Sequence, residues 1–200
     1  LRGNFVHGDD LAVVAARFRQ ANNVKMIDCT VTGLHSAMWA TGCTKVVVEG
    51  LTVTECLNGI SVGTSQDVTV ADSVIETTSD DGYGIRADGS GDYALTVEDC
   101  AVEAFAPVLV RNATSDDYEV TMNGDNDLTA TNDDGYAVAF SKGDYNANTP
   151  LVEPTASPSF VNTGSAVNTN AVAAGSGVAN NGATSGVYAK GTWKGAVLQK

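Results

Sequence analysis

Residues 24–75 read VKMIDCTVTGLHSAMWATGCTKVVVEGLTVTECLNGISVGTSQDVTVADSVI and contain three copies of one pattern. Val24, Val46 and Val68 open the copies at equal intervals, since 46 − 24 = 22 and 68 − 46 = 22. Within each copy apolar residues alternate with other residues, which is the period of a β-strand. Recurrence at a fixed period of about 20 to 25 residues is typical of a solenoid, in which each copy forms one coil. The stretch therefore predicts a stack of coils built from short strands.

The segment before the first copy can be interpreted in two ways. As a helix, residues 9–22 would begin at an aspartate cap and place Leu11, Val14 and Phe18 on one face. As a strand, residues 12–18 match residues 36–41 and 59–63, which precede the later copies. We favour the strand, because residues 22–24 continue into the next coil as residues 44–46 do.

After Ile75 the period lengthens. Residues 92–97 return as residues 117–122, an offset of 25, and residues 80–85 return as residues 133–138, an offset of 53. Insertions in a solenoid fall at the turns, so larger loops are expected near residues 79–83 and 123–134, where function is usually added.

The pattern ends at about Tyr145, and this predicts two parts: a solenoid over residues 1–144 and an irregular segment over residues 145–200. Residues 146–158 contain three of the four prolines and predict an irregular crossing segment. Residues 164–186 are rich in Ala, Gly, Asn and Ser, and fit either a disordered tail or a covering segment. Residues 187–193 regain strand character and are expected to dock on the stack.

The composition limits the partners. Lys and Arg number 11 against 24 Asp and Glu, for a net charge of −13 in 200 residues. Such a surface repels phosphate, so nucleic acid and anionic membranes are not expected as partners. Acidic polysaccharides are disfavoured too, unless a local basic patch or bound cations intervene. The sequence has no run of 18 apolar residues, so membrane insertion is not expected. The acidic, Thr- and Asn-rich composition favours an extracellular or virion-surface location.

The four cysteines show no CxxC pairing that would indicate a metal or redox motif. Cys29 and Cys100 fall in one repeat column with Leu51 and Ser73 between them. A position shared with leucine predicts a buried thiol, so reduced core cysteines are favoured over disulfides.

The coils resemble right-handed parallel β-helices of the pectin-lyase-like superfamily. The resemblance covers roughly residues 9–141 and rests on NGISV at 58–62 followed by DVTV at 67–70, and on CTKVVV at 43–48 leading to LTV at 51–53. PSFVN at 158–162 is similar to a segment that often follows the last coils. The resemblance implies an all-β, right-handed parallel β-helix of about six coils. Activity is left open, because the superfamily includes lyases, glycosidases, epimerases, adhesins, phage tailspikes and other virion proteins.

Enzymes of the polygalacturonase type carry N-T-D, D-D, G-H-G and R-I-K motifs. This sequence has aspartate pairs but neither G-H-G nor R-I-K. Lyases of the pectate-lyase type combine acidic Ca²⁺ ligands with an Arg or Lys base, for which the sequence offers candidates only.

One outward column carries the substrate-binding candidates. Arg17, Trp39 and Ser61 each lie seven residues before an opening valine, with apolar neighbours that point inward. Strand similarity adds Arg86 and Arg111. Coils stack about 4.8 Å apart, so the five side chains would line one face over about 20 Å. Tryptophan and guanidinium groups suit a glycan. The alternative is that these long side chains pack at a surface or subunit interface, and we favour it.

Two aspartate pairs, Asp80–Asp81 and Asp133–Asp134, are the metal candidates. Carboxylate and carbonyl oxygens could bind Ca²⁺ there. The alternative is that an aspartate before glycine starts a turn, and we favour it.

We therefore expect a non-catalytic module on a cell or virion surface, with a structural, decoration or attachment role and a possible glycan contact. A homo-oligomer, for instance a trimer, would cover the open ends of a short β-helix. The alternative is a polysaccharide lyase or glycosidase in which Arg86 or Arg111 acts beside an aspartate cluster. An Arg86–Arg111 groove that also contains Asp80, Asp81 or Asp88 would favour the enzyme.

Overall fold

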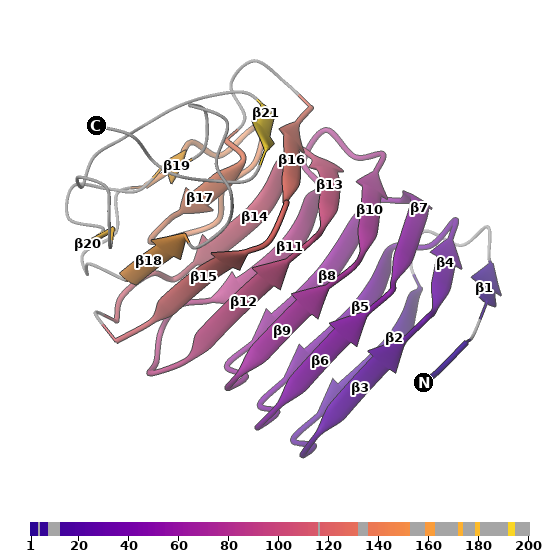
Figure 1. The fold of residues 1–200 in the computed structure, drawn as a ribbon. Helices are drawn as coiled ribbons and strands as arrows, with labels where there is room; N and C mark the ends of the chain where they lie inside the picture. Colours follow the sequence, from indigo (N-terminus) through magenta and orange to yellow (C-terminus); the bar gives the residue numbers. More distant parts are fainter. Residues whose placement is uncertain are drawn as a thin grey trace.

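The chain folds as a three-sided stack of β-strands (Figure 1). The computed structural model describes residues 1–3, 5–7, 13–115, 117–131, 136–152, 159–162, 172–173, 179–180 and 192–194. These residues form three sheets, each with seven strands in the described part of the chain. We name each sheet after its strand in the first complete coil, as the β2, β3 and β4 sheets.

The strands of the β2 sheet are β2 (Val14–Arg19), β5 (Ser36–Thr41), β8 (Asn58–Gly63), β11 (Tyr83–Asp88), β14 (Ala106–Arg111), β17 (Val138–Phe140) and β19 (Val172–Ala173). Those of the β3 sheet are β3 (Val24–Ile27), β6 (Val46–Glu49), β9 (Val68–Ala71), β12 (Ala94–Glu98), β15 (Glu119–Asn123), β18 (Ser159–Asn162) and β20 (Ala179–Asn180). Those of the β4 sheet are β1 (Phe5–His7), β4 (Thr30–Thr32), β7 (Thr52–Cys56), β10 (Val74–Thr77), β13 (Ala101–Ala104), β16 (Asp127–Ala130) and β21 (Thr192–Lys194).

The register confirms the period expected from the sequence. Val24 lies opposite Val46, and Val46 lies opposite Val68, in parallel pairing. The longer offsets are confirmed too, because Thr96 pairs with Thr121, while Ile85 and Val138 both pair with Val108. The fifteen strands from β2 to β16 make five complete coils of three, and β17 and β18 begin a further one. The predicted all-β solenoid of about six coils is confirmed.

The inward side chains of the three sheets form one continuous apolar core. Val48, Val53, Ile60 and Ile85 are fully buried there. Burial of one such side chain contributes about 1.5 to 3 kcal/mol. All four cysteines are buried and free, including Cys29 and Cys100, for which the repeat alignment predicted burial.

The corner between the β3 and β4 sheets needs a left-handed backbone in every complete coil. The residues at this corner all have positive φ values: Asp28 (52°), Gly50 (63°), Asp72 (48°), Asp99 (50°) and Gly124 (64°). Glycine reaches this region without strain, and aspartate tolerates it better than most residues. Part of the acidic composition therefore serves to turn the chain.

The two ends of the stack bear on the remaining sequence predictions. The strand interpretation of the first segment is confirmed over Val14–Arg19, and residues 8–12 lie outside the described residues. At the other end β18 pairs parallel with β15, so strand pairing continues beyond residue 144. β21 pairs antiparallel with β16, so the described end of the segment expected to dock, residues 192–193, lies on the stack, while residues 187–191 lie outside the described residues. No helix in the described part of the chain is long and apolar enough to cross a membrane.

Candidate functional site

An open groove lies on the outer face of the β2 sheet. Its volume is about 330 Å³, and it crosses β5, β8, β11 and β14. The residues that line it are His35, Trp39, Asn58, Asp81, Tyr83, Arg86, Leu109, Arg111, Asp144, Tyr145 and Asn146. Three of the five predicted substrate-binding residues are among them: Trp39, Arg86 and Arg111.

Four of the five predicted residues share one register position. Arg17 pairs with Trp39, Trp39 with Ser61, and Ser61 with Arg86. The placement of Arg111 in this column was wrong. Leu109 lies opposite Arg86, and Arg111 lies opposite Asp88, two residues further along the strand. Inward valines alternate with outward residues in Val108-Leu109-Val110-Arg111. Leu109 and Arg111 are therefore both outward, and the comparison of strand sequences selected Arg111 where the register has Leu109.

Arg86 is the central cation of the groove. Its Nε and Nη2 atoms donate to Ser61 Oγ at 3.2 and 3.0 Å, and its guanidinium lies 4.1 Å from the centre of the Tyr83 ring. Burial lowers the pKa of Arg86 from its ordinary value, although an arginine stays protonated. Among the described residues no carboxylate is ion-paired with this guanidinium. Arg86 is therefore a half-buried positive charge that neutral groups hold in place.

Arg111 is arranged differently. Its Nη1 atom donates to Asp144 Oδ1 at 2.8 Å, and the two side chains are 34% and 65% exposed. The four charged residues of the lining, Arg86, Arg111, Asp81 and Asp144, sum to zero, whereas the whole chain carries −13. Because Asp144 is paired with Arg111, the positive charge of Arg86 is the one left for a ligand.

Trp39 lies at one end of the groove with one ring face covered. The Arg17 guanidinium stands 4.4 Å from the ring centre, and His35 meets the ring edge-on at 5.8 Å. The Trp39 Nε1 atom is buried and has no hydrogen-bond partner. A sugar stacked on Trp39 must therefore use the other face or displace the exposed Arg17 side chain.

One wall of the groove comes from residues 141–152, which we call the strap. The Lys142 amide donates to the Val152 carbonyl at 2.8 Å, which closes the ends of the strap. Near its tip, Asn146 and Thr149 exchange backbone hydrogen bonds of 3.0 and 3.1 Å. Sequence reasoning missed this wall, since residues 146–152 fall in the stretch predicted only to be irregular.

The strap packs on the sheet through Tyr145. This side chain is 6% exposed and lies 5.1 Å from the Phe105 ring and 5.8 Å from the Tyr136 ring, between ring centres. Leu109 belongs to the same small apolar cluster, separate from the main core. The strap is thus a packed element of the groove.

The metal candidates divide between two situations. Asp80 and Asp81 lie in the turn before β11, where the Asp81 amide donates to Ser79 Oγ and the Gly82 amide to the Ser79 carbonyl. Both aspartates lie in a turn, as favoured, but Ser79 and not an aspartate side chain makes its local hydrogen bonds. Asp133 and Asp134 lie outside the described residues. Among the residues that the structure does describe, no group of three or more His, Cys, Asp or Glu side chains could hold a metal ion, and calcium stays a prediction.

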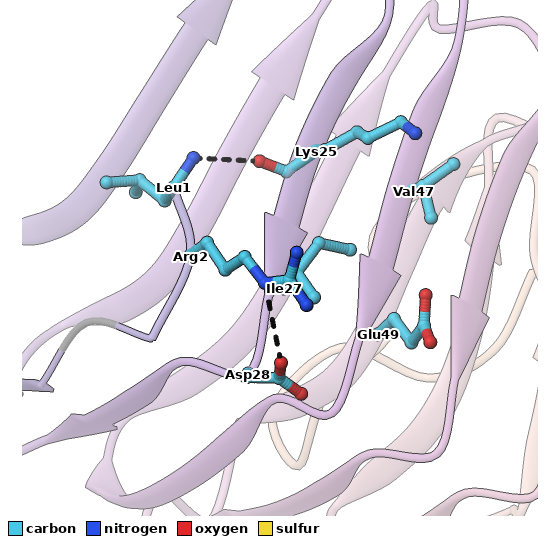
Figure 2. Close-up of a pocket in the computed structure, with 7 residues that line it drawn as sticks. All are labelled: Leu1, Arg2, Lys25, Ile27, Asp28, Val47 and Glu49. Atoms are coloured by element: carbon cyan, nitrogen blue, oxygen red, sulfur yellow. Dashed lines mark hydrogen bonds and ion pairs between the residues drawn. The ribbon is translucent and has the colours of Figure 1, made fainter.

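A second hollow, of about 470 Å³, lies over β3 and β6 (Figure 2). The Leu1 amino group donates to the Lys25 carbonyl at 3.1 Å, and Arg2 Nε lies 3.8 Å from Asp28 Oδ2. The Arg2 and Asp28 side chains are 80% and 62% exposed, so their ion pair contributes little. The side chains in this hollow do not converge on a common point, and it offers no comparable site.

The acids and bases of the groove already have partners. Asp144 pairs with Arg111, and His35 Nδ1 lies 2.8 Å from Ser36 Oγ. Asp81 accepts hydrogen bonds from Ala147 and Asn148 of the strap. The described groove thus presents the Arg86 cation, the partly exposed Trp39 ring, and amide and hydroxyl groups.

This architecture defines a parallel β-solenoid protein with a groove on one sheet. The family model described as the right-handed beta helix region matches residues 12–126. The chain therefore belongs to the right-handed β-helix family, and the fold is consistent with the pectin-lyase-like superfamily named above. No curated protein and no solved structure matches the sequence.

Proposed function

We propose that the chain is a non-catalytic β-helix module that binds an anionic glycan in the groove of the β2 sheet. One observation carries this proposal: the Arg86 guanidinium is half-buried at the groove and has no described carboxylate as an ion-pair partner. A guanidinium binds carboxylate and sulfate groups through paired hydrogen bonds. Its positive charge is costly to bury without a partner, and a ligand anion would supply one.

The other groups of the groove suit a sugar. The partly exposed Trp39 offers apolar ring surface, and Asn58 and Asn146 offer amide groups. Aromatic rings pack on the apolar faces of sugars, while amides pair with hydroxyl groups. The neutral charge balance of the lining reduces, at the groove, the repulsion that the chain's net charge imposes on an acidic polysaccharide.

We place binding before catalysis because both groove carboxylates are engaged. A general acid or base needs an accessible group tuned for proton transfer. Asp81 accepts from the strap and Asp144 pairs with Arg111. Neither is poised to give or take a proton at a bound sugar.

The wider setting is part of the same proposal. The acidic composition supports exposure on a cell or virion surface, where such a module would have an attachment or decoration role. A homo-oligomer would cover the ends of the stack, because exposed strand edges invite pairing. Light scattering tests the oligomer directly: a trimer supports this part of the proposal and a monomer contradicts it.

The experiment that tests the binding is a calorimetric titration with oligogalacturonates, sulfated oligosaccharides and neutral cello-oligosaccharides. We expect binding of an acidic series and none of the neutral series. Equal binding of neutral and acidic sugars would contradict the role of Arg86, and no binding of any series would contradict the proposal.

A polysaccharide lyase is the second candidate, and one observation favours it. Arg86 and Arg111 line one groove together with Asp81, the arrangement that was expected from the sequence for the enzyme. Incubation with polygalacturonate separates the candidates, since a lyase produces an unsaturated sugar that absorbs ultraviolet light and a binding module does not.

A further inference from the structure

The turn before β11 and the strap are joined across 66 residues of sequence. Asp81 Oδ1 accepts a hydrogen bond from the Ala147 amide at 3.0 Å, and Asp81 Oδ2 accepts one from Asn148 Nδ2 at 3.4 Å. Both carboxylate oxygens therefore face the same short stretch of the strap. Asp80, the preceding residue, is also exposed and makes no such contact among the described residues.

This junction lies at the tip of the strap. Asn146 Oδ1 accepts from the Asn148 amide at 3.0 Å, and Asn146 is bridged to Thr149. The Ala147 amide points out of this tight turn, so the strap itself does not satisfy it. A carboxylate is a stronger acceptor than a neutral oxygen, and Asp81 supplies one at this place.

We infer that Asp81 is a positioning residue: its carboxylate anchors the strap and so holds Asp144 and Tyr145 at the groove. The hydrogen bond between Lys142 and Val152 closes the ends of the strap. Along its length the strap is attached to the stack through the Asp144–Arg111 ion pair, the packed Tyr145 ring and the Asp81 carboxylate. Asp81 is the attachment that fixes the tip. Without the Asp81 carboxylate, the ends of the strap stay closed, but its tip is no longer fixed beside the groove.

The effect on ligand binding rests on the proposed function, whereas the anchoring does not. Arg111 pairs with Asp144, and Tyr145 lines the groove beside Leu109. A displaced tip changes where both strap residues stand relative to Arg86 and Arg111. We therefore expect Asp81 to influence affinity through the placement of the strap.

The test compares Asp81→Ala, Asp81→Asn and Asp80→Ala, with wild type as reference. Hydrogen exchange reports on the Ala147 amide, and calorimetry with an oligogalacturonate reports on the groove. Asp81→Ala should speed exchange at Ala147 about tenfold, the effect of losing one hydrogen bond to a charged acceptor. The Asn variant keeps one oxygen that accepts from the Ala147 amide, so it should restore most of the protection and of the affinity. Asp80→Ala should resemble wild type in both measurements.

The outcomes separate the inference from the proposed function. Exchange at Ala147 that is equal in the Asp81→Ala and Asp80→Ala variants overturns the anchoring. Faster exchange with unchanged affinity overturns the positioning of the groove by Asp81. Faster exchange in a protein whose wild type binds no oligogalacturonate supports the anchoring and counts against the proposed function alone.

Discussion

Arg86 and Ser61 are joined by two hydrogen bonds between neighbouring coils, from Nε at 3.2 Å and from Nη2 at 3.0 Å to one hydroxyl oxygen. The hydroxyl orients the guanidinium and leaves its charge uncompensated. Because Ser61 is a neutral acceptor, the positive charge of Arg86 stays available to an anionic ligand. A carboxylate side chain at position 61 would occupy that site instead.

Substitutions of Ser61 test that relationship. Ser61→Ala should weaken binding of an acidic oligosaccharide by up to about tenfold, since a hydrogen bond contributes about 0.5 to 1.5 kcal/mol. Ser61→Thr keeps the hydroxyl and serves as the control. Ser61→Asp places a carboxylate beside Arg86 and should reduce the affinity by more than tenfold in the same calorimetric titration. Wild-type affinity in Ser61→Asp would contradict a role for the Arg86 charge.

Asp144 is expected to compete with an anionic ligand for Arg111. Asp144→Asn removes this competitor, so affinity for an acidic oligosaccharide should rise two- to fivefold, while the free energy of unfolding falls by less than about 1 kcal/mol. Asp92→Asn makes the same charge change at an exposed turn away from the groove. If both variants raise the affinity equally, the effect comes from net charge, and competition at Arg111 is contradicted.

Two glycines of β8 provide a matched pair for the packing of the coils. A Cβ atom at Gly59 would collide with the Gly84 carbonyl oxygen and lie 2.7 Å from Ile75 Cγ2, whereas at Gly63 its nearest neighbour would be 3.8 Å away. Gly59→Ala should therefore lower the free energy of unfolding by about 1 to 3 kcal/mol. Gly63→Ala should change it by less than about 0.5 kcal/mol. Denaturant unfolding measures both, and equal effects would contradict the close approach of the coils at Gly59.

The buried Cys100 thiol predicts a loss of stability in alkali. Burial raises the pKa of Cys100 from 9.0 to about 11. As the pH rises, the thiol therefore loses its proton in the unfolded chain before it does so in the folded protein. The stabilisation of the folded state by the protonated Cys100 thiol is complete below pH 9 and is lost between pH 9 and 11. The slope should reach about 1.4 kcal/mol per pH unit for this group. Burial also raises the pKa of Tyr118, so Cys100→Ala should flatten the decline over pH 9 to 11 without abolishing it. An unchanged slope in this variant would contradict the assignment.

The repeat made the fold predictable from sequence. Val24, Val46 and Val68 are interior residues of successive coils, and a solenoid places residues at a fixed spacing into one register. The same logic placed Arg17, Trp39 and Ser61 in one column. It failed at Arg111. The partner of Arg86 in the next coil is Leu109, 23 residues later, whereas Arg111 lies 25 residues later. Because side chains alternate between inward and outward, residues 109 and 111 both point outward, and the alternation does not distinguish them.

The wall of the groove could not be predicted in this way. Asp81 meets Ala147, and Tyr145 meets Phe105, through contacts that follow no period. Such contacts depend on how the irregular strap packs on the outer face of the β2 sheet. The sequence does predict that Asp81 lies in a turn, but it does not predict which groups donate hydrogen bonds to the Asp81 carboxylate.

The most direct measurement is the affinity of wild type, Arg86→Gln and Arg19→Gln for an oligogalacturonate, by calorimetry at low and moderate salt. Arg19 is an exposed arginine of the same sheet and does not line the groove. Binding that is lost in Arg86→Gln and kept in Arg19→Gln is the predicted result. Equal affinities in all three proteins would contradict an anion site at Arg86.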